Sequence, residues 1–170
     1  MTETYIYGVK VNGNFEIYHK IADSQLGALN LWNFVAKKYF GDSISSIIRD
    51  ESEDLIWNII NYNKMPIDEK ILLASTFDGA YLHVRNLPDF ALAIQTLSER
   101  GMVGNFEEHI RSIAEIFTNH DSEIIAWDHN PADHFYWGDL NVKKNISNYE
   151  NFNIFEIPPI KEYFQSIALK

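Results

Sequence analysis

Residues 4–20 read TYIYGVKVNGNFEIYHK, and this stretch predicts a β-hairpin. On either side of Asn12-Gly13, aromatic and β-branched residues alternate with other side chains, which is typical of a half-buried strand. Asn-Gly favours a tight hairpin turn because both residues tolerate positive φ. We therefore expect two antiparallel strands, at residues 4–11 and 15–20.

Apolar residues at helical spacing predict four helices after this hairpin, over residues 24–40, 51–62, 88–100 and 105–119. The first helix begins at the capping residue Ser24 and ends before Gly41, which favours the conformation of a helix C-terminus. Pro88 suits the first turn of the third helix, where a missing N–H costs little. The third helix is expected to bury Phe90, Ile94 and Leu97.

A second hairpin is predicted over residues 70–84. Residues 70–77 form a short apolar run, and Asp78-Gly79 follows as a second turn signal. Residues 80–84 would then return as the partner strand. A further strand is expected at residues 122–127.

Two hairpins, each followed by two helices, predict an α+β fold with a mainly antiparallel sheet and helices packed on one of its faces. The length of 170 residues suits a single globular domain. Residues 141–170 are expected to pack on that domain as a C-terminal arm, because they carry too many apolar side chains for a disordered tail. This arm is predicted to contain a last strand and a short helix near residues 160–168.

The composition excludes several classes of site. The chain has no cysteine, so disulfides, thiolate metal sites and cysteine nucleophiles are ruled out. The sequence shows neither a signal-peptide pattern nor an apolar run of the ~18 residues that a membrane span requires. We therefore expect a cytoplasmic protein that does not bind membranes.

The 24 acidic and 14 basic residues give a net charge of −10, and the surplus is concentrated in one part of the sequence. Residues 67–140 hold 13 acidic and 4 basic residues, which is a local net charge of −9. Such a field repels nucleic acid and favours a basic protein as partner. Solubility alone is the simpler alternative, because acidic surfaces commonly serve it.

No catalytic motif accompanies this charge. Residues 101–104 lack the spacing and the lysine of a phosphate-binding loop, no serine lies in a nucleophile elbow, and the chain has no His-Glu-x-x-His pair. Basic and aromatic residues do not interleave as an RNA-binding sheet requires. We therefore expect no cofactor, no direct nucleic-acid binding and, on balance, no enzymatic activity.

One stretch, WDHNPADHFYWGD at residues 127–139, contains residue types that bind metals. Asp128, His129, Asp133 and His134 could ligate zinc, manganese or iron and support a metal-dependent hydrolase. Turn formation around the Asn-Pro pair explains the same residues without a metal. Because metal sites usually draw their ligands from several regions of a chain, the metal is the weaker alternative.

The same stretch is also typical of a recognition surface, because aromatic side chains anchor interfaces and acidic ones contact a basic partner. Tyr136 and Trp137 are the expected anchors. Acidic residues of the predicted helix 105–119 and of the stretches after it complete the candidate surface. The predicted partner-binding residues are Glu107, Glu108, Glu115, Asp121, Glu123, Asp128, Asp133, Tyr136, Trp137 and Asp139.

A small, acidic, cysteine-free domain without a catalytic motif is similar in composition to proteins that inhibit a basic partner. Bacterial immunity proteins and phage anti-defence proteins, anti-CRISPR proteins among them, have this profile. The composition implies a non-catalytic inhibitor of a basic protein, such as a nuclease or another nucleic-acid enzyme, with carboxylates in the place of phosphates. Two alternatives stay open. One is the metal-dependent hydrolase, and the other is a homo-oligomeric structural protein of a phage or mobile element, assembled through its sheet edge or its C-terminal arm.

Overall fold

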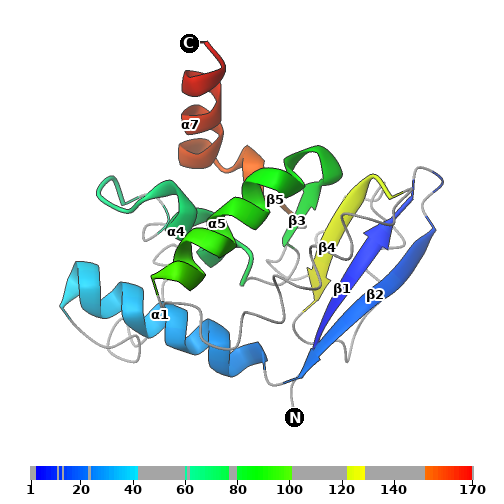
Figure 1. Ribbon diagram of the computed structural model, residues 1–170, viewed down its shortest axis with the longest axis horizontal. Helices are drawn as coiled ribbons and strands as arrows, with labels where there is room; N and C mark the ends of the chain where they lie inside the picture. Colours follow the sequence, from blue (N-terminus) through cyan, green and yellow to red (C-terminus); the bar gives the residue numbers. More distant parts are fainter. Residues whose placement is uncertain are drawn as a thin grey trace.

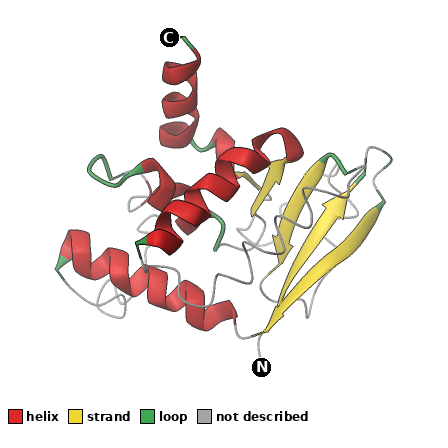
Figure 2. Ribbon diagram, in the orientation of Figure 1, coloured by secondary structure: helices red, strands yellow, loops and turns green. Residues whose placement is uncertain are grey.

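The computed structural model describes residues 3–10, 12, 14–22, 24–41, 60, 62–76, 80–100, 122–128 and 152–169. In this part of the chain a five-stranded sheet stands beside a group of helices (Figures 1 and 2). The strands, in their order across the sheet, are β2 (Phe15–Ala22), β1 (Glu3–Val9), β4 (Ile124–Asp128), β3 (Ala80–His83) and β5 (Phe152–Asn153). The helices are α1 (Ser24–Phe40), α4 (Ile67–Ala74), α5 (Leu87–Glu99) and α7 (Pro158–Ala168), with the 3-10 turns η1 (Val84–Asn86) and η5 (Ile154–Glu156).

The sheet is mainly antiparallel, and only the pairing of β3 with β5 is parallel. Because successive residues of a strand point to opposite faces, the sheet has two distinct sides. Ile6, Leu82 and Ile125 belong to the main core, together with apolar side chains of all four helices. The opposite face carries a smaller cluster around Tyr7 and Ala126. The predicted α+β fold, with helices packed on a sheet, is confirmed.

The first hairpin is confirmed, with β1 and β2 antiparallel from Glu3↔Ala22 to Val9↔Phe15. Its turn is closed by the backbone N–H of Lys10, which donates to the carbonyl of Asn14 at 2.8 Å, and by the side chain of Asn12, which accepts from the backbone N–H of Asn14 at 3.0 Å. The register shifts between Ile6 and Tyr7, so that Tyr18 is an extra residue on β2. This is a β-bulge, which bends and twists the strand.

Helices α1 and α5 lie where the sequence predicts them, at Ser24–Phe40 and Leu87–Glu99. Gly41 follows α1 with a φ of 73°, the left-handed conformation that glycine favours at a helix end. Phe90, Ile94 and Leu97 of α5 are fully buried, as expected. The strand predicted at residues 122–127 is confirmed as β4. The helix predicted at 105–119 lies outside the described residues, and so does most of the one at 51–62.

The prediction of a strand at residues 70–77 is wrong for the part that the structure describes, because Ile67–Ala74 forms helix α4. A short apolar run has the same appearance in a buried strand and in a helix that is buried on most sides. Every residue from Glu69 to Ala74 is buried, which accounts for the continuous apolar pattern. Pro66 at the N-cap and two acidic residues in the first turn favour the helix. Strand β3 therefore pairs with β4 and β5 and not with residues 70–74.

The described end of the predicted C-terminal arm packs into the main core through Ile154, Phe155, Ile157 and Ile160. The carboxamide of Asn153 accepts a hydrogen bond from the backbone N–H of Phe155 at 3.0 Å and so caps η5. After this anchor α7 extends away from the other helices (Figure 1). The predicted last strand and short helix of the arm are thus observed as β5 and α7.

Candidate functional site: a buried glutamate and an exposed aromatic surface

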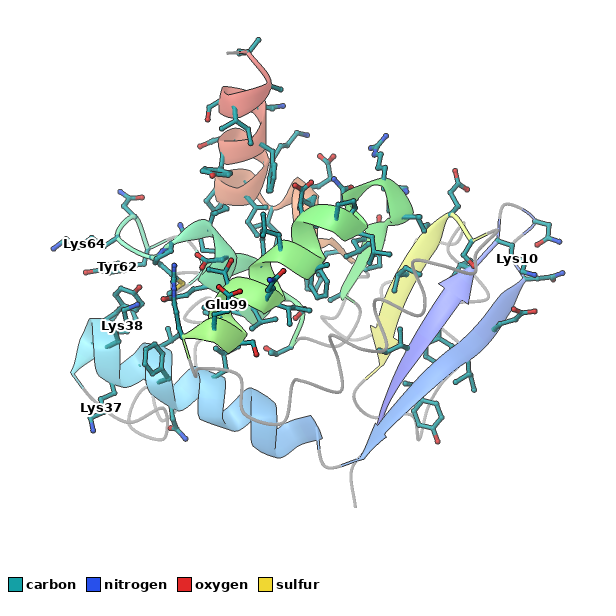
Figure 3. All side chains as sticks on the ribbon, viewed as in Figure 1. Lys10, Lys37, Lys38, Tyr62, Lys64 and Glu99 are labelled. Atoms are coloured by element: carbon teal, nitrogen blue, oxygen red, sulfur yellow. The ribbon has the colours of Figure 1, made fainter. Side chains whose placement is uncertain are left out.

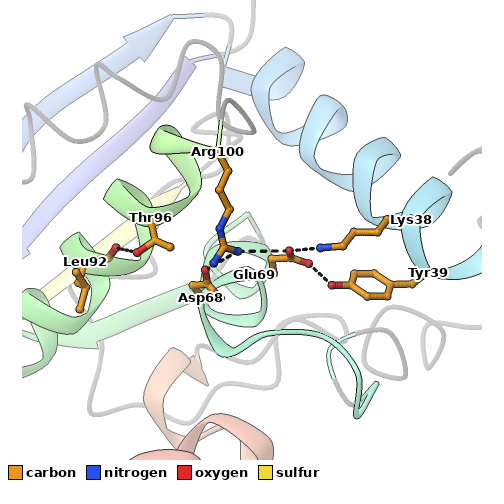
Figure 4. Close-up of polar contacts among 7 residues, drawn as sticks. All are labelled: Lys38, Tyr39, Asp68, Glu69, Leu92, Thr96 and Arg100. Carbon is orange, nitrogen blue, oxygen red and sulfur yellow. Dashed lines mark hydrogen bonds and ion pairs between the residues drawn. The ribbon is translucent and has the colours of Figure 1, made fainter.

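Three helices meet at a cluster of charged side chains around Glu69 of α4 (Figure 4). The Glu69 carboxylate is completely buried. It accepts hydrogen bonds from Lys38 Nζ at 2.5 Å and from the Tyr39 hydroxyl at 2.7 Å, both on α1. Arg100, which follows α5, lies 3.1 Å from Asp68 Oδ2 and 4.0 Å from Glu69 Oε1. The cluster therefore joins the end of α1, the start of α4 and the end of α5.

The charges of this cluster are balanced, with two carboxylates against an ammonium and a guanidinium. Burial by itself lowers the pKa of Lys38, but its hydrogen bonds to Glu69 and Tyr39 outweigh that effect and raise the pKa above the usual lysine value. Burial and the Glu69 carboxylate raise the pKa of Tyr39, against an opposing effect of Lys38. Asp68 Oδ2 is buried and accepts no hydrogen bond from a described residue, but it lies 3.1 Å from the Arg100 guanidinium and is paired with it by charge. Buried charges persist only when paired in this way, so the cluster positions helices.

Lysines and aromatic rings lie next to this cluster, where α1 ends (Figure 3). We call the group formed by Phe34, Lys37, Phe40, Tyr62 and Lys64 the α1 surface; Tyr62 is half-buried, and the other four side chains are exposed. Phe34 and Phe40 are 38% and 43% exposed, and the rings of Phe40 and Tyr62 are 5.3 Å apart between centroids. Both lysines are exposed. Exposed rings among polar side chains are typical of binding surfaces.

Two of the predicted partner-binding residues lie in the described part of the chain, at opposite ends of β4. Glu123 is exposed and immediately precedes the strand. Its backbone N–H donates to Val9 at 2.8 Å, and its carbonyl accepts from Val84 at 2.9 Å. Asp128 ends the strand, opposite Tyr5 of β1. Because a strand rises about 3.3 Å per residue, their backbones are about 16 Å apart.

The other candidates lie outside the described residues, so the acidic recognition surface and the metal site both stay predictions. These residues are Glu107, Glu108, Glu115, Asp121, His129, Asp133, His134, Tyr136, Trp137 and Asp139. Within the described ranges, no group of three or more histidine and acidic side chains could hold a metal ion.

The two stretches that carry most of these candidates begin and end at well-anchored positions. Residues 101–121 follow Arg100, which is held by Asp68, and precede Ser122, which is buried. Residues 129–151 connect β4 to β5, two strands that both pair with β3.

No local pattern in the sequence predicts the Glu69 cluster. Lys38 and Glu69 are 31 residues apart, so their contact has no local signal. The only clue is a pair of acidic residues at the start of the apolar run of residues 67–74, because a charge on a buried segment requires a partner. The α1 surface is not predicted either. The helical spacing of α1 indicates which of its residues share a face, but not which other segment lies beside that face.

Comparisons with protein-family models, with curated proteins and with solved structures find no match to this chain. None of the helices in the described ranges is both long enough and apolar enough to cross a membrane.

Lys70 of α4 is a buried cation of a different kind, because it makes no ion pair with a described residue and is only 6% exposed. Burial lowers the pKa of Lys70 below the usual lysine value of 10.5, since the buried ammonium loses hydration. Replacing Lys70 by Met is expected to raise the free energy of unfolding by about 1 kcal/mol at neutral pH. Urea unfolding measures the gain.

The pH dependence of this gain has a definite sign. A lowered pKa in the folded state penalises folding at every pH below it, and the penalty fades as the pH rises toward the unfolded value. The gain of the Lys70→Met variant should therefore shrink as the pH approaches 10.5. A gain that is independent of pH would show that packing, and not the buried charge, causes it.

Proposed function

We propose that this chain is an acidic, non-catalytic binding protein that inhibits a basic partner. The observation that carries the proposal is the position of the acidic surplus. Residues 101–140 hold eight acidic residues and one basic residue. By contrast, Asp68 and Glu69 are engaged with Lys38 and Arg100 inside the fold. The net charge of residues 101–140 is therefore −7, out of −10 for the whole chain.

Electrostatic complementarity supplies the physical mechanism. A concentrated negative field accelerates encounter with a basic protein and orients it, and salt weakens this effect. On a nuclease or another nucleic-acid enzyme, carboxylates would occupy the positions of phosphates and prevent substrate binding. Inhibitors of this kind act in the cytoplasm in phage anti-defence or in bacterial immunity, and we propose the same setting here.

The edge of the sheet supports a heterologous partner over self-assembly through strands. Strand β2 lies at the edge and carries Glu16 and Lys20 together with the bulge at Tyr18. Charged side chains and bulges on edge strands are the features that prevent edge-to-edge pairing. Pairing between two copies through β2 is therefore disfavoured.

Charge reversal within the surplus tests the proposal. The full chain is immobilised, basic proteins retained from a host lysate are identified, and one of them is purified for binding measurements. Reversing Glu108, Asp121 and Asp133 to lysine is expected to weaken binding by at least about tenfold, mainly through a slower association rate. Thermal stability should change little, because surface substitutions usually alter it by less than about 0.5 kcal/mol each.

A matched control carries the same change of net charge elsewhere. Glu16, Glu99 and Glu162 are exposed and lie outside residues 101–140. Their reversal to lysine should leave the affinity within about threefold of the original, apart from a small effect of net charge. Equal losses in the two variants would mean that net charge alone drives the interaction, and normal binding by the first variant would refute the proposal.

A further inference from the structure

Helix α7 projects from the fold, and only its first part packs on the main core (Figure 1). Ile160 is completely buried, and the half-buried ring of Phe164 lies against Phe155 with 5.3 Å between the ring centroids. Residues 165–169, in contrast, are all exposed. An isolated helix of 11 residues has little stability in water without packing, so the projecting end of α7 gains most from a further partner.

The apolar side of α7 that enters the core continues beyond it. Ile160, Tyr163, Phe164 and Ile167 follow one another at helical spacing and so lie on one side of the helix. The ring centroids of Tyr163 and Phe164 are 5.3 Å apart, which joins the exposed part of this side to the buried part. Tyr163 and Ile167 are 43% and 46% exposed. We call Tyr163, Phe164 and Ile167 the α7 stripe, and a contiguous apolar group of this kind marks a binding surface.

We propose that two copies of this chain pair through the α7 stripe, with their α7 helices antiparallel about a twofold axis. In a twofold contact both copies present the same surface, so Tyr163 of one copy packs on Ile167 of the other. The projection of α7 from the fold leaves its exposed end accessible to the second copy (Figure 1). This inference goes beyond the proposed function and does not depend on it.

Charge favours a second copy over a basic protein as the occupant. Helix α7 contains one lysine and one glutamate, Lys161 and Glu162, so its net charge is zero in a chain with a net charge of −10. A neutral helix gives a basic protein no electrostatic gain, whereas two acidic copies meet there with little repulsion.

The antiparallel orientation reduces the repulsion between the two copies further. It places the acidic remainders of the two chains at opposite ends of the helix pair. At about 1.5 Å per residue, the 11 residues of α7 separate them by about 16 Å. This is twice the screening length of about 8 Å at physiological salt.

Sedimentation equilibrium of the full chain between about 5 μM and 1 mM tests the proposal. The contact is smaller than the about 1,200 Å² of a standard interface, so we expect a reversible dimer with a Kd of about 10–100 μM. The variant Tyr163→Ser/Ile167→Ser is expected to dimerise at least about tenfold more weakly. Melting temperatures of all variants are recorded at the lowest concentration, to show that each one is folded.

A matched control removes two exposed apolar side chains that lie outside the α7 stripe. Leu92 and Leu169 are 61% and 89% exposed. Leu169 lies two residues after Ile167 and therefore on another side of the helix. The variant Leu92→Ser/Leu169→Ser should dimerise within about twofold of the original protein.

Cross-linking tests the orientation of the two helices, because the chain has no cysteine of its own. A disulfide requires Cα atoms within about 7 Å of each other. An equimolar mixture of the Tyr163→Cys and Ile167→Cys variants is therefore expected to form linked dimers at least about fivefold faster than either variant alone.

Three results would overturn the proposal. The first is a chain that stays monomeric up to about 1 mM; a lower melting temperature of monomeric Tyr163→Ser/Ile167→Ser would then show that the same chain covers the stripe. The second is an equal loss of dimer in Leu92→Ser/Leu169→Ser, which would mean that the association is not specific to α7. The third is faster cross-linking of Tyr163→Cys alone than of the mixture, which would exclude the antiparallel pair.

Discussion

Replacing Glu69 by Gln is expected to lower the free energy of unfolding by about 1–3 kcal/mol, which is the range for disrupting a buried charged hydrogen bond. The substitution keeps the shape of the side chain but leaves the partly exposed Lys38 ammonium without its anion, whereas Arg100 keeps its ion pair with Asp68. Because Lys38 belongs to α1, the loss should loosen the attachment of α1 to α4. Urea unfolding measures it.

A matched control for this substitution is Glu99→Gln. Glu99 lies on α5, is exposed, and accepts a hydrogen bond from the side chain of its neighbour Gln95 at 3.0 Å. Its replacement should cost less than about 0.5 kcal/mol. If Glu69→Gln were equally harmless, the cluster would contribute nothing to the association of the three helices.

Replacing Phe90 by Ala is expected to cost about 3–5 kcal/mol. Phe90 is completely buried in the main core, so its removal leaves a cavity where α5 packs on the rest of the fold. Replacing Leu92, which lies on the same helix and is 61% exposed, should cost less than about 0.5 kcal/mol. Similar losses at both positions would mean that α5 is rotated about its axis relative to the arrangement described above.

Local signals in the sequence predicted the elements whose structure depends on neighbouring residues. Asn12-Gly13 marked the first hairpin because the turn geometry is a property of those two residues. The boundaries of α1 followed from Ser24 and Gly41, where the helix begins and where the backbone adopts a φ of 73°. The spacing of Phe90, Ile94 and Leu97 identified the buried face of α5.

The sequence also predicted part of the candidate site, but it predicted which kinds of residue take part and not how they are arranged. The acidic surplus follows from composition. Glu123, which the sequence predicts inside a strand at residues 122–127, is exposed and lies just before β4. The α1 surface does not follow from the sequence, because the contact between Tyr62 and Phe40 joins segments on either side of residues 42–59. Contacts of this kind depend on how separate elements pack, so no periodic pattern in the sequence indicates them.

The sequence by itself determined the first hairpin, α1, α5, β4 and the acidic balance of the chain, because caps, turn residues and periodicity act within a few residues. Only the tertiary structure decided that residues 67–74 form a helix, that β3 pairs in parallel with β5, and that Glu69 meets Lys38. Burial on most sides hides the helical period of α4, and the environment of a buried segment then selects its conformation. Sheet order and buried ion pairs join residues that are far apart along the chain, so their free energy exists only in the assembled fold.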